Sequence, residues 1–493
     1  MPRVMPRVRC VRCSHKLETT DLDPACNKCG SPVIIAGREG VSVSESDLEG
    51  LSPGVWRYRA FLPEIANEDI VTLGEGATPL LQAERLGDEL GLDHLLLKDE
   101  SRNPTGSFLD RGSTVLVSLA SRSGVRECAC VTTGNLGASL AAYCAKANIR
   151  ARIRVNPNTD QGKLFQMLAY GAEVEASSTS SFEPDATRRL LAVTAANPYL
   201  LEGEKTTGFE MVQELGWKSP DVVVVPVGTG GHLSMIWRSL VEMRLAGLLD
   251  QSSCRLLGVR LEEPPARSNA PRGNREAFLR SSQLVELEES EHFFLSEAER
   301  SMAESGGAEI TTTGSQALAA TSLLARTEGI FAEPSSASVV ACLGESIRSG
   351  QIRKGERVVC VITGAGLKDT KAVSRLARQT RRVALREGLA MRSPTIGETK
   401  LVILRLLRRS PGYGYELWLL LRSSRRISTA SVYQHLSELE ELLLVRRRGF
   451  VVTKGRERVV YELTKKGADF LKMMDRLGLP SRNTRRSMDP APS

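Results

Sequence analysis

The sequence lacks both a long apolar run and the features of an export signal. No stretch approaches the ~18 consecutive apolar residues of a membrane-spanning helix. The N-terminal segment 1–10 contains arginine and proline but has no apolar stretch behind it. We therefore expect a cytoplasmic protein with no membrane partner. At 493 residues, of which 41% are hydrophobic, the chain has room for about three domains with packed cores.

A positive net charge is also missing from most of the chain. The whole sequence has a net charge of +8, but residues 381–493 contain 24 Lys+Arg and 11 Asp+Glu, a net charge of +13. Residues 1–380 therefore have a net charge of −5. This distribution predicts a polyanionic partner for the C-terminal segment. A basic tail without any partner would have the same composition, so charge alone leaves both interpretations open.

Disulfides are rare in the cytoplasm, which bears on the cysteines near the N-terminus. Two Cys-x-x-Cys pairs are separated by 12 residues, and they contain Cys10, Cys13, Cys26 and Cys29. Four thiolates at this spacing are typical of a closed structural zinc site, around which a segment too short for its own core can fold. A disulfide pair or four reduced thiols are the alternatives. We predict a zinc ribbon over residues 1–40.

Residues 50–378 alternate between short apolar runs and amphipathic stretches. This alternation is typical of an α/β fold with mostly parallel sheets, in which ligands bind beyond the carboxyl ends of the strands. The predicted strands include Leu95–Lys98, Ala129–Thr132, Val222–Val227, Leu256–Val259 and Val358–Ile362, and Ala138–Lys146 is a predicted helix. Six further cysteines lie in apolar surroundings and are expected in the core: Cys128, Cys130, Cys144, Cys254, Cys342 and Cys360. Residues 379–394 are predicted to be a linker, and residues 481–493 a disordered tail.

Several short motifs follow one another along this α/β region. They are Trp-Arg-Tyr-Arg (56–59), Gly-Glu-Gly-Ala-Thr-Pro-Leu (74–80), Lys-Asp-Glu (98–100), Asn-Pro-Thr-Gly-Ser-Phe-Leu-Asp-Arg-Gly (103–112), Thr-Thr-Gly-Asn-Leu-Gly-Ala-Ser (132–139), Val-Gly-Thr-Gly-Gly (227–231), Glu-Pro-Ser-Ser-Ala (333–337) and Thr-Gly-Ala-Gly-Leu-Lys-Asp (363–369). Their order resembles the threonine synthases, enzymes of fold type II that use pyridoxal phosphate (PLP). Some members of that family have a similar N-terminal ribbon. The resemblance implies two mostly parallel α/β subdomains after the ribbon.

The resemblance also implies a PLP site. Gly228, Thr229, Gly230 and Gly231 are similar to the family's phosphate cup, where backbone N–H groups and a helix N-terminus surround the phosphate. The helix is expected to begin near Ser234. By the same resemblance Asn135 would bond the 3′-oxygen of the ring and Thr363 the ring nitrogen. Further ligand contacts would come from Ser107, Thr132 and Thr133.

The lysine that characterises the family is missing. In threonine synthases it holds the cofactor aldehyde and transfers protons, and Leu109 occupies its place here and can do neither. A threonine that helps to hold the amino-acid carboxylate is replaced by Leu136. The resemblance therefore implies non-covalent PLP and no catalytic residue at position 109. Lys98 and Lys205 are possible substitutes, but both have positions of their own in the family pattern, and misplacement by even about 1 Å is costly.

Residues 395–480 have the pattern of a winged helix. A helix is predicted over Lys400–Arg409, a second opens at 413–417, and a third is capped by Ser428 or Thr429. The apolar stripe of the third helix is Val432, Leu436, Leu439 and Leu443. A β-hairpin over Val445–Leu463 and a last helix follow. The segments Gly-Tyr-Gly-Tyr-Glu-Leu (412–417), Ser-Val-Tyr-Gln-His-Leu (431–436) and Tyr-Glu-Leu-Thr-Lys-Lys-Gly (461–467) resemble PadR-like regulators.

This second resemblance implies duplex DNA as a partner. The third helix would enter the major groove and present Thr429, Ser431, Gln434 and His435 to base edges. Arginines of the wing and its flank, including Arg446, Arg456 and Arg458, would meet phosphates. A winged helix that binds protein is the alternative. A homodimer is expected, because such regulators usually read two-fold sites.

Together these features predict a transcriptional regulator whose PLP-fold body senses a small molecule. The ligand would be PLP, an amino acid, a phosphorylated amino acid, or an adduct of PLP with one of them. An active threonine synthase with an accessory DNA-binding domain is the alternative. A structural pseudoenzyme that pairs with an active paralogue is a third hypothesis.

Overall fold

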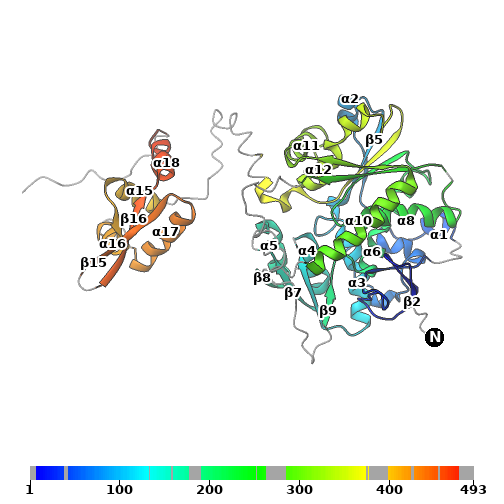
Figure 1. The fold of residues 1–493 in the computed structure, drawn as a ribbon, viewed down its shortest axis with the longest axis horizontal. Helices are drawn as coiled ribbons and strands as arrows, with labels where there is room; N and C mark the ends of the chain where they lie inside the picture. Colours follow the sequence, from blue (N-terminus) through cyan, green and yellow to red (C-terminus); the bar gives the residue numbers. More distant parts are fainter. Residues whose placement is uncertain are drawn as a thin grey trace, which may run out of the picture. The chain divides into compact units, whose positions relative to one another are not determined.

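The computed structural model describes residues 7–37, 43–132, 134–156, 159–176, 190–250, 252–262, 285–372, 376, 398–422, 427–453 and 456–476. The chain divides into two compact units, residues 1–382 and 383–493 (Figure 1). The predicted linker and C-terminal tail lie outside the described residues. None of the helices in the described part of the chain combines the length and the apolar content needed to cross a bilayer.

A small antiparallel sheet begins the first unit. Strands β1 (Arg7–Cys10), β2 (Lys16–Glu18) and β3 (Val33–Ile35) lie in the order β2-β1-β3. The segment is too short for a core of its own, and its buried Val8 and Val33 belong to the hydrophobic core of the α/β body. Asn197 of the body also donates to the Leu22 carbonyl at 2.7 Å. The ribbon is therefore attached to the body by both packing and hydrogen bonds.

The larger sheet of the first unit has the strand order β12-β11-β10-β13-β5-β4, and only β4 pairs antiparallel to its neighbour. Its strands are β4 (Leu80–Gln82), β5 (His94–Asp99), β10 (Val222–Pro226), β11 (Arg255–Leu261), β12 (Ala308–Thr312) and β13 (Arg357–Ile362). Successive valines of β10 point to opposite faces: Val222 and Val224 pack in one core and Val223 and Val225 in another.

Helices cover both faces of this sheet (Figure 1). One face packs against α2 (Glu84–Leu90), α11 (Gly314–Thr327), α12 (Pro334–Ala341) and α13 (Leu343–Arg348). The other packs against α7 (Thr206–Glu214), α8 (Gly231–Leu245) and α10 (Val285–Ser305). The short helices are α1 (Glu45–Glu49), η1 (Val55–Phe61), η2 (Asn67–Asp69), η3 (Glu100–Arg102) and η4 (Gly366–Lys368).

The smaller sheet is parallel throughout, with the strand order β8-β7-β6-β9. Its strands are β6 (Glu127–Thr132), β7 (Arg150–Val155), β8 (Glu173–Ala176) and β9 (Leu190–Val193), and its helices are α3 (Leu109–Arg122), α4 (Asn135–Lys146), α5 (Gln161–Ala169) and α6 (Pro198–Glu204). The two mostly parallel subdomains confirm the predicted α/β fold. All six cysteines assigned to the core are buried.

The second unit is a helical domain with a three-stranded antiparallel sheet, ordered β14-β16-β15. Its elements are α15 (Glu398–Arg409), β14 (Gly412–Tyr413), α16 (Gly414–Arg422), α17 (Thr429–Glu441), β15 (Val445–Thr453), β16 (Arg456–Leu463) and α18 (Lys465–Arg476). It has a separate hydrophobic core, which includes Leu404, Leu417 and Leu436. The predicted winged-helix pattern is confirmed, and Ser428 is the residue that caps α17.

Two details of the sequence prediction were wrong. Leu443 is not part of the buried stripe of α17, because the helix ends at Glu441 and Leu443 adopts a left-handed φ of 58°. Its side chain is 64% exposed, and Leu444 is buried in its place. The helix expected near Ser234 begins at Gly231, so the glycine loop leads directly into its first turn.

Candidate functional site

Leu109 is held at the start of α3 by a short backbone pairing. Phe108 N–H donates to the Thr363 carbonyl at 3.1 Å, and Ala365 N–H donates to the Gly106 carbonyl at 2.9 Å. Residues 106–108 therefore run alongside residues 363–365, two segments that are far apart in the sequence. This pairing brings position 109 close to Thr363, the predicted partner of the ring nitrogen.

Glu333 links the two residues that are predicted to contact the PLP ring, Asn135 and Thr363. Asn135, the first residue of α4, donates from Nδ2 to Glu333 Oε2 at 2.9 Å. Glu333 N–H donates to the Gly364 carbonyl at 3.0 Å, and Gly364 directly follows Thr363. The Thr363 hydroxyl lies 2.8 Å from that of Ser336. The structure thus brings Asn135 and Thr363 together, as the predicted PLP site requires.

The predicted phosphate cup lies between β10 and α8. A Cβ at Gly228 would meet nothing within 4 Å, whereas one at Gly230, which has a φ of +92°, would lie 2.5 Å from the Phe294 carbonyl oxygen. Position 230 therefore requires glycine. The helix that follows has 15 residues, and its N-terminus, where Gly231 N–H donates to the Thr229 hydroxyl at 3.4 Å, provides the positive end of a helix dipole.

His232 connects this cup to the segment that contains Leu109. Its ring stacks on Phe108 with centroids 4.1 Å apart, and its Nε2 lies 3.1 Å from the Thr207 hydroxyl. Burial lowers the pKa of His232 to about 3, so the ring is neutral at physiological pH. The sequence prediction did not include this residue, although it directly follows the glycine loop.

Several buried polar atoms in this region have no hydrogen-bond partner among the described residues. They are Ser107 Oγ, Asn135 Oδ1 and His232 Nδ1. Unpaired buried polar atoms are costly, so a polar ligand would stabilise them. The phosphate, hydroxyl and pyridine nitrogen of PLP are groups of the required kind. Thr132 accepts from Gly134 N–H at 3.0 Å, and Thr133 lies outside the described residues.

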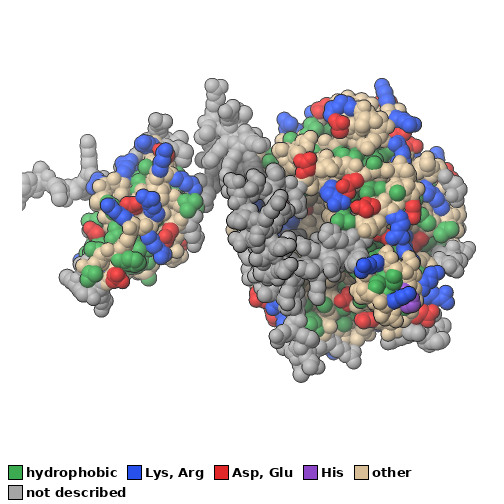
Figure 2. All heavy atoms as spheres, in the orientation of Figure 1, with side chains coloured by type: hydrophobic (Ala, Val, Ile, Leu, Met, Phe, Trp, Pro, Cys, Tyr) green, Lys and Arg blue, Asp and Glu red, His purple; other side chains and the backbone are tan. Residues whose placement is uncertain are grey.

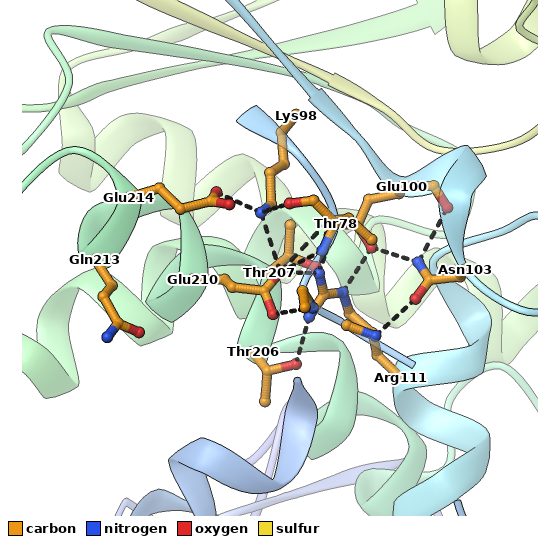
Figure 3. A network of polar contacts seen from close by, with 12 residues as sticks. Thr78, Lys98, Glu100, Asn103, Arg111, Thr206, Thr207, Glu210, Gln213 and Glu214 are labelled. Carbon is orange, nitrogen blue, oxygen red and sulfur yellow. Dashed lines mark hydrogen bonds and ion pairs between the residues drawn. The ribbon is translucent and has the colours of Figure 1, made fainter. Parts of the chain in front are cut away.

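The two lysines considered as substitutes for position 109 are fixed elsewhere. Lys98 Nζ lies 2.6 Å from Glu214 Oε2 and 3.0 Å from Glu210 Oε2, as Figure 3 shows. Lys205 Nζ lies 2.7 Å from Glu202 and 2.8 Å from Glu242. Each buried amine is paired with two carboxylates, and removing it would leave uncompensated buried charges. Both amines are therefore already held by buried ion pairs.

Arg111 lies in the first turn of α3 and shares Glu210 with Lys98, so the same network of ion pairs holds this turn in place (Figure 3). Its guanidinium bonds Glu100 and Glu210, and it also donates to the Thr206 hydroxyl at 3.1 Å. Burial disfavours the charged guanidinium, but the two carboxylates outweigh burial and raise the pKa of Arg111. The scaffold that orients position 109 is therefore intact, although the residue at that position is apolar and buried.

Sequence reasoning missed three charged groups beside the predicted PLP site, namely Lys163, Glu333 and Lys368. Lys163 Nζ lies 2.9 Å from Glu333 Oε1, and Lys368 Nζ donates to the Thr105 carbonyl at 2.7 Å. Burial lowers the pKa of Lys368 to about 8. One available signal was that Lys163 follows a strand of a parallel sheet at its carboxyl end, where ligands bind.

The four N-terminal cysteines form one cluster, with all four sulfurs within 4.8 Å of one another. Cys10 Sγ lies 3.5 Å from Cys29 Sγ, and Cys13 Sγ lies 3.7 Å from Cys26 Sγ. Tetrahedral zinc with Zn–S bonds of about 2.3 Å would separate its sulfurs by about 3.8 Å. The cluster therefore fits the zinc ribbon predicted from the spacing.

Metal analysis of the purified protein should find about one zinc per chain, and Cys13→Ser should release it. Because the site would hold the ribbon together, its loss should lower the melting temperature more than it weakens ligand binding. The matched control is Cys254→Ser, a buried cysteine outside the cluster, which should keep the zinc. A ribbon that stays folded in strong chelator without bound metal would contradict the assignment.

Of the four predicted base-reading residues of α17, Gln434 is hydrogen-bonded to a carboxylate and His435 lies near the same one. Gln434 Nε2 donates to Glu438 Oε1 at 3.1 Å, and His435 Nδ1 lies 3.6 Å from Glu438 Oε2. Ser431 N–H bonds the capping Ser428, and Thr429 begins the helix. Tyr433 is exposed beside Gln434, but the sequence prediction did not include it among the base-reading residues. The roles of these residues toward DNA stay predictions.

The arginines that are predicted to bind phosphate differ in the contacts that their side chains make in the structure. Arg446 Nε lies 2.7 Å from Glu462, and both groups are on the hairpin. The Arg458 guanidinium lies over the rings of Tyr415 and Tyr413, at 4.8 and 5.4 Å from the centroids. The Arg456 side chain lies outside the described residues. Figure 2 shows Lys and Arg side chains spread among hydrophobic ones on the visible face of this unit.

Known proteins resemble both units. Residues 71–364 match the family described as pyridoxal-phosphate dependent enzyme, and residues 403–473 match the PadR-like family of transcriptional regulators. The threonine synthase of Methanocaldococcus jannaschii is 35% identical over 390 residues, which cover 75% of this chain and 95% of that protein. The threonine synthase of Methanosarcina acetivorans is 33% identical over 388 residues, covering 75% and 94%. Among solved structures, threonine deaminase isoform 2 from Solanum lycopersicum matches 72% of this chain and 98% of its own, with 18% identity and a TM-score of 0.45.

Proposed function

Because the chain belongs to the family of pyridoxal-phosphate dependent enzymes and has a PadR-like domain at its C-terminus, we propose that it is a ligand-sensing transcriptional regulator. This proposal rests on the presence of leucine at position 109, where the family has its lysine. The residues that would contact the PLP phosphate and ring are present, while position 109 lacks the amine that the chemistry needs. A pocket that binds but does not react is suited to sensing.

In this proposal PLP is held without a covalent bond from position 109. When bound, PLP supplies an electrophilic aldehyde on an electron-withdrawing ring. The cup at Gly228–Gly231 would bind its phosphate, Asn135 its 3′-oxygen and Thr363 its ring nitrogen. Because the Thr363 hydroxyl is no strong acid, it would leave that nitrogen unprotonated. The sensed molecule would be PLP, an amino acid, a phosphorylated amino acid, or an adduct of PLP with one of them.

The C-terminal unit would bind duplex DNA, with α17 in the major groove and the arginines of the hairpin on phosphates. We propose that the protein acts as a homodimer, because a two-fold dimer matches a palindromic site. Threonine synthesis, the activity named for the relatives, is disfavoured by Leu109 and by the ion pairs that hold Lys98 and Lys205. A purely structural partner of an active paralogue would explain Leu109 but not the PadR-like domain.

Coupling between the two units tests this function. We expect PLP together with the correct amino acid to change the affinity of the full-length protein for its selected DNA site by about 5- to 150-fold. By linkage, the DNA must change the ligand affinity by the same factor. Fluorescence anisotropy measures the first shift and PLP titration with and without DNA measures the second.

Thr363→Val provides the matched control, because it keeps the shape of the side chain and removes the hydroxyl proposed to contact the ring nitrogen, together with its bond to Ser336. The variant should still bind DNA but lose most of the response to PLP. If the full-length protein bound no DNA at low salt with any ligand, the regulator function would be rejected.

A further inference from the structure

The segment that leads out of the first unit begins in the predicted PLP site. Thr363 directly follows β13, and η4 and then Thr370 and Lys371 come shortly after it. The chain continues through residues 373–382 into the C-terminal unit. Residues 370–372 end the last run of consecutive described residues before that unit. A displacement of these residues would displace the point from which the chain leaves the first unit.

Asp160 holds this end of the first unit. Its carboxylate accepts hydrogen bonds from the Thr370 N–H at 3.0 Å, the Thr370 hydroxyl at 2.9 Å and the Lys371 N–H at 3.1 Å. It also accepts from Gly162 N–H at 2.9 Å and so caps α5. Burial disfavours the charged carboxylate, but the hydrogen bonds outweigh burial and lower the pKa of Asp160. Because hydrogen bonds to an ionised group are roughly twice as strong as neutral ones, Asp160 attaches α5 firmly to residues 370–371.

The first turn of α5 reaches a predicted ring contact through Lys163. Lys163 Nζ lies 2.9 Å from Glu333 Oε1, and Glu333 Oε2 accepts from Asn135 Nδ2 at 2.9 Å. The Lys163 side chain also crosses Gly134, where an added Cβ would overlap its Cδ. The helix that Asp160 caps is thus joined to the residue predicted to bond the 3′-oxygen.

The helix α5 and η4 also contact each other directly and share an acceptor in the loop before α3. Gln166 Nε2 donates to the Thr105 carbonyl at 3.0 Å, and Lys368 Nζ donates to the same oxygen at 2.7 Å. A Cβ at Gly162 would lie 3.0 Å from the Leu367 carbonyl oxygen, so the first turn of α5 packs against η4. These contacts make α5 and the segment that follows Thr363 a single connected element.

We propose that the hydrogen bonds of Asp160 with Thr370 and Lys371 transmit ligand binding from the PLP site to the C-terminal unit. The inference rests on the function proposed above and assigns the coupling that this function requires. A series of contacts transmits binding only if the ligand interacts differently with two arrangements of an element within it. The element assigned to this role is α5.

Glu333 provides the different interaction. With the 3′-oxygen of the ring on Asn135, Glu333 would face a second negative charge, and repulsion between like charges would displace its carboxylate. Lys163 is paired with that carboxylate, so the first turn of α5 would shift with it. The Asp160 cap lies at the start of the same turn, and its hydrogen bonds would carry the shift to residues 370–371.

Hydrogen exchange of the full-length protein tests this role without DNA. Saturating PLP should change exchange in the peptide that contains the Thr370 and Lys371 amides by about threefold or more, because both amides donate to Asp160. Unchanged exchange with PLP bound would overturn the inference, whether or not the affinity for DNA responded to PLP.

Asp160→Ser tests the transmission to DNA. Serine caps a helix about as well as aspartate, but its shorter side chain cannot keep the hydrogen bonds with Thr370 and Lys371. The variant should bind PLP, and DNA without PLP, within about twofold of the unmodified protein, while the roughly 5- to 150-fold change of DNA affinity caused by PLP with a mixture of amino acids should disappear. Asp250→Ser is the matched control, because Asp250 is exposed and also accepts from the N–H two residues on, and it should keep the full change. A full change in Asp160→Ser would overturn the inference and leave the regulator function standing.

Thr370→Val decides the question if Asp160→Ser does not fold. It removes the hydroxyl that donates to Asp160 and keeps the backbone N–H donors, so the change of DNA affinity should fall by about threefold or more. An undiminished change in this variant would overturn the inference. If the unmodified protein bound both PLP and DNA but PLP with the amino acids left its DNA affinity unchanged, the regulator function itself would be rejected, and this inference with it.

Discussion

The unmodified protein is expected to form no threonine from phosphohomoserine above the rate of free PLP. Proton transfer by a positioned group contributes about 10²- to 10⁴-fold to such reactions, and Leu109 has no proton to transfer. Lys98 and Lys205 do not replace this role, because two carboxylates hold each of these amines. Threonine measured with an amino-acid analyser, compared with PLP alone, checks the prediction. Threonine formed at the rate of an enzyme would contradict it.

Leu109→Lys should restore a bond between position 109 and the cofactor. The backbone pairing of residues 106–108 and the ion pairs of Arg111 hold the start of α3, so a lysine there would project from an orientation that is already set. Borohydride should then place a phosphopyridoxyl label on residue 109. Leu109→Met is the matched control, since it has a similar volume and no amine. A label on another lysine, or no label, in the Leu109→Lys variant would contradict this expectation.

Restored bonding need not restore turnover, because Leu136 also departs from the family pattern. Leu136 is buried in the first turn of α4, directly after Asn135. Leu109→Lys combined with Leu136→Thr supplies both the amine and the hydroxyl that the family uses for the substrate carboxylate. Any threonine formation should therefore appear in the double variant before it appears in either single one.

The parts of the fold that depend on local pattern were predictable from the sequence. The valine run of β10 and the apolar run of β13 each form a strand that is buried on both faces, because continuous apolar runs between glycine turns are stable only inside a parallel sheet. The cysteine spacing likewise predicted the cluster. The end of α17 was not predictable in the same way, because Leu443 fits the helical period and is removed from the stripe only by its left-handed backbone.

The charged contacts of the site depend on tertiary structure and were missed for that reason. Lys163 and Glu333 are 170 positions apart in the sequence, and no local pattern relates them. Lys98 of β5 likewise pairs with Glu210 and Glu214 of α7, and Lys205 pairs with Glu242 of α8, over distances in the sequence that no local pattern relates. Gln434 and Glu438, by contrast, are four residues apart on one helix, so their contact could have been inferred from helical spacing.

Residues 383–493, produced alone, are expected to bind duplex DNA with a strong dependence on salt. This unit has its own hydrophobic core and lies within the segment whose net charge is +13. Each phosphate that a Lys or Arg neutralises releases counterions, so six to ten such contacts would lower affinity by about 10³- to 10⁵-fold between 50 and 200 mM salt. Anisotropy titrations at several salt concentrations give the slope. A slope near zero would mean that the basic surface does not meet phosphates.

Two substitutions should separate sequence reading from phosphate binding in this unit. Gln434→Ala removes an exposed amide that can bond a base edge, so it should relax the preference at one base position by about 1–3 kcal/mol. Arg456→Ala should weaken all sequences alike and reduce the salt slope by about one, because a wing arginine meets only phosphate. Since Gln434 donates to Glu438 in the absence of DNA, reading a base requires that this bond break. If Gln434→Ala left the base preference unchanged while Arg456→Ala altered it, the assigned roles of α17 and the wing would be reversed.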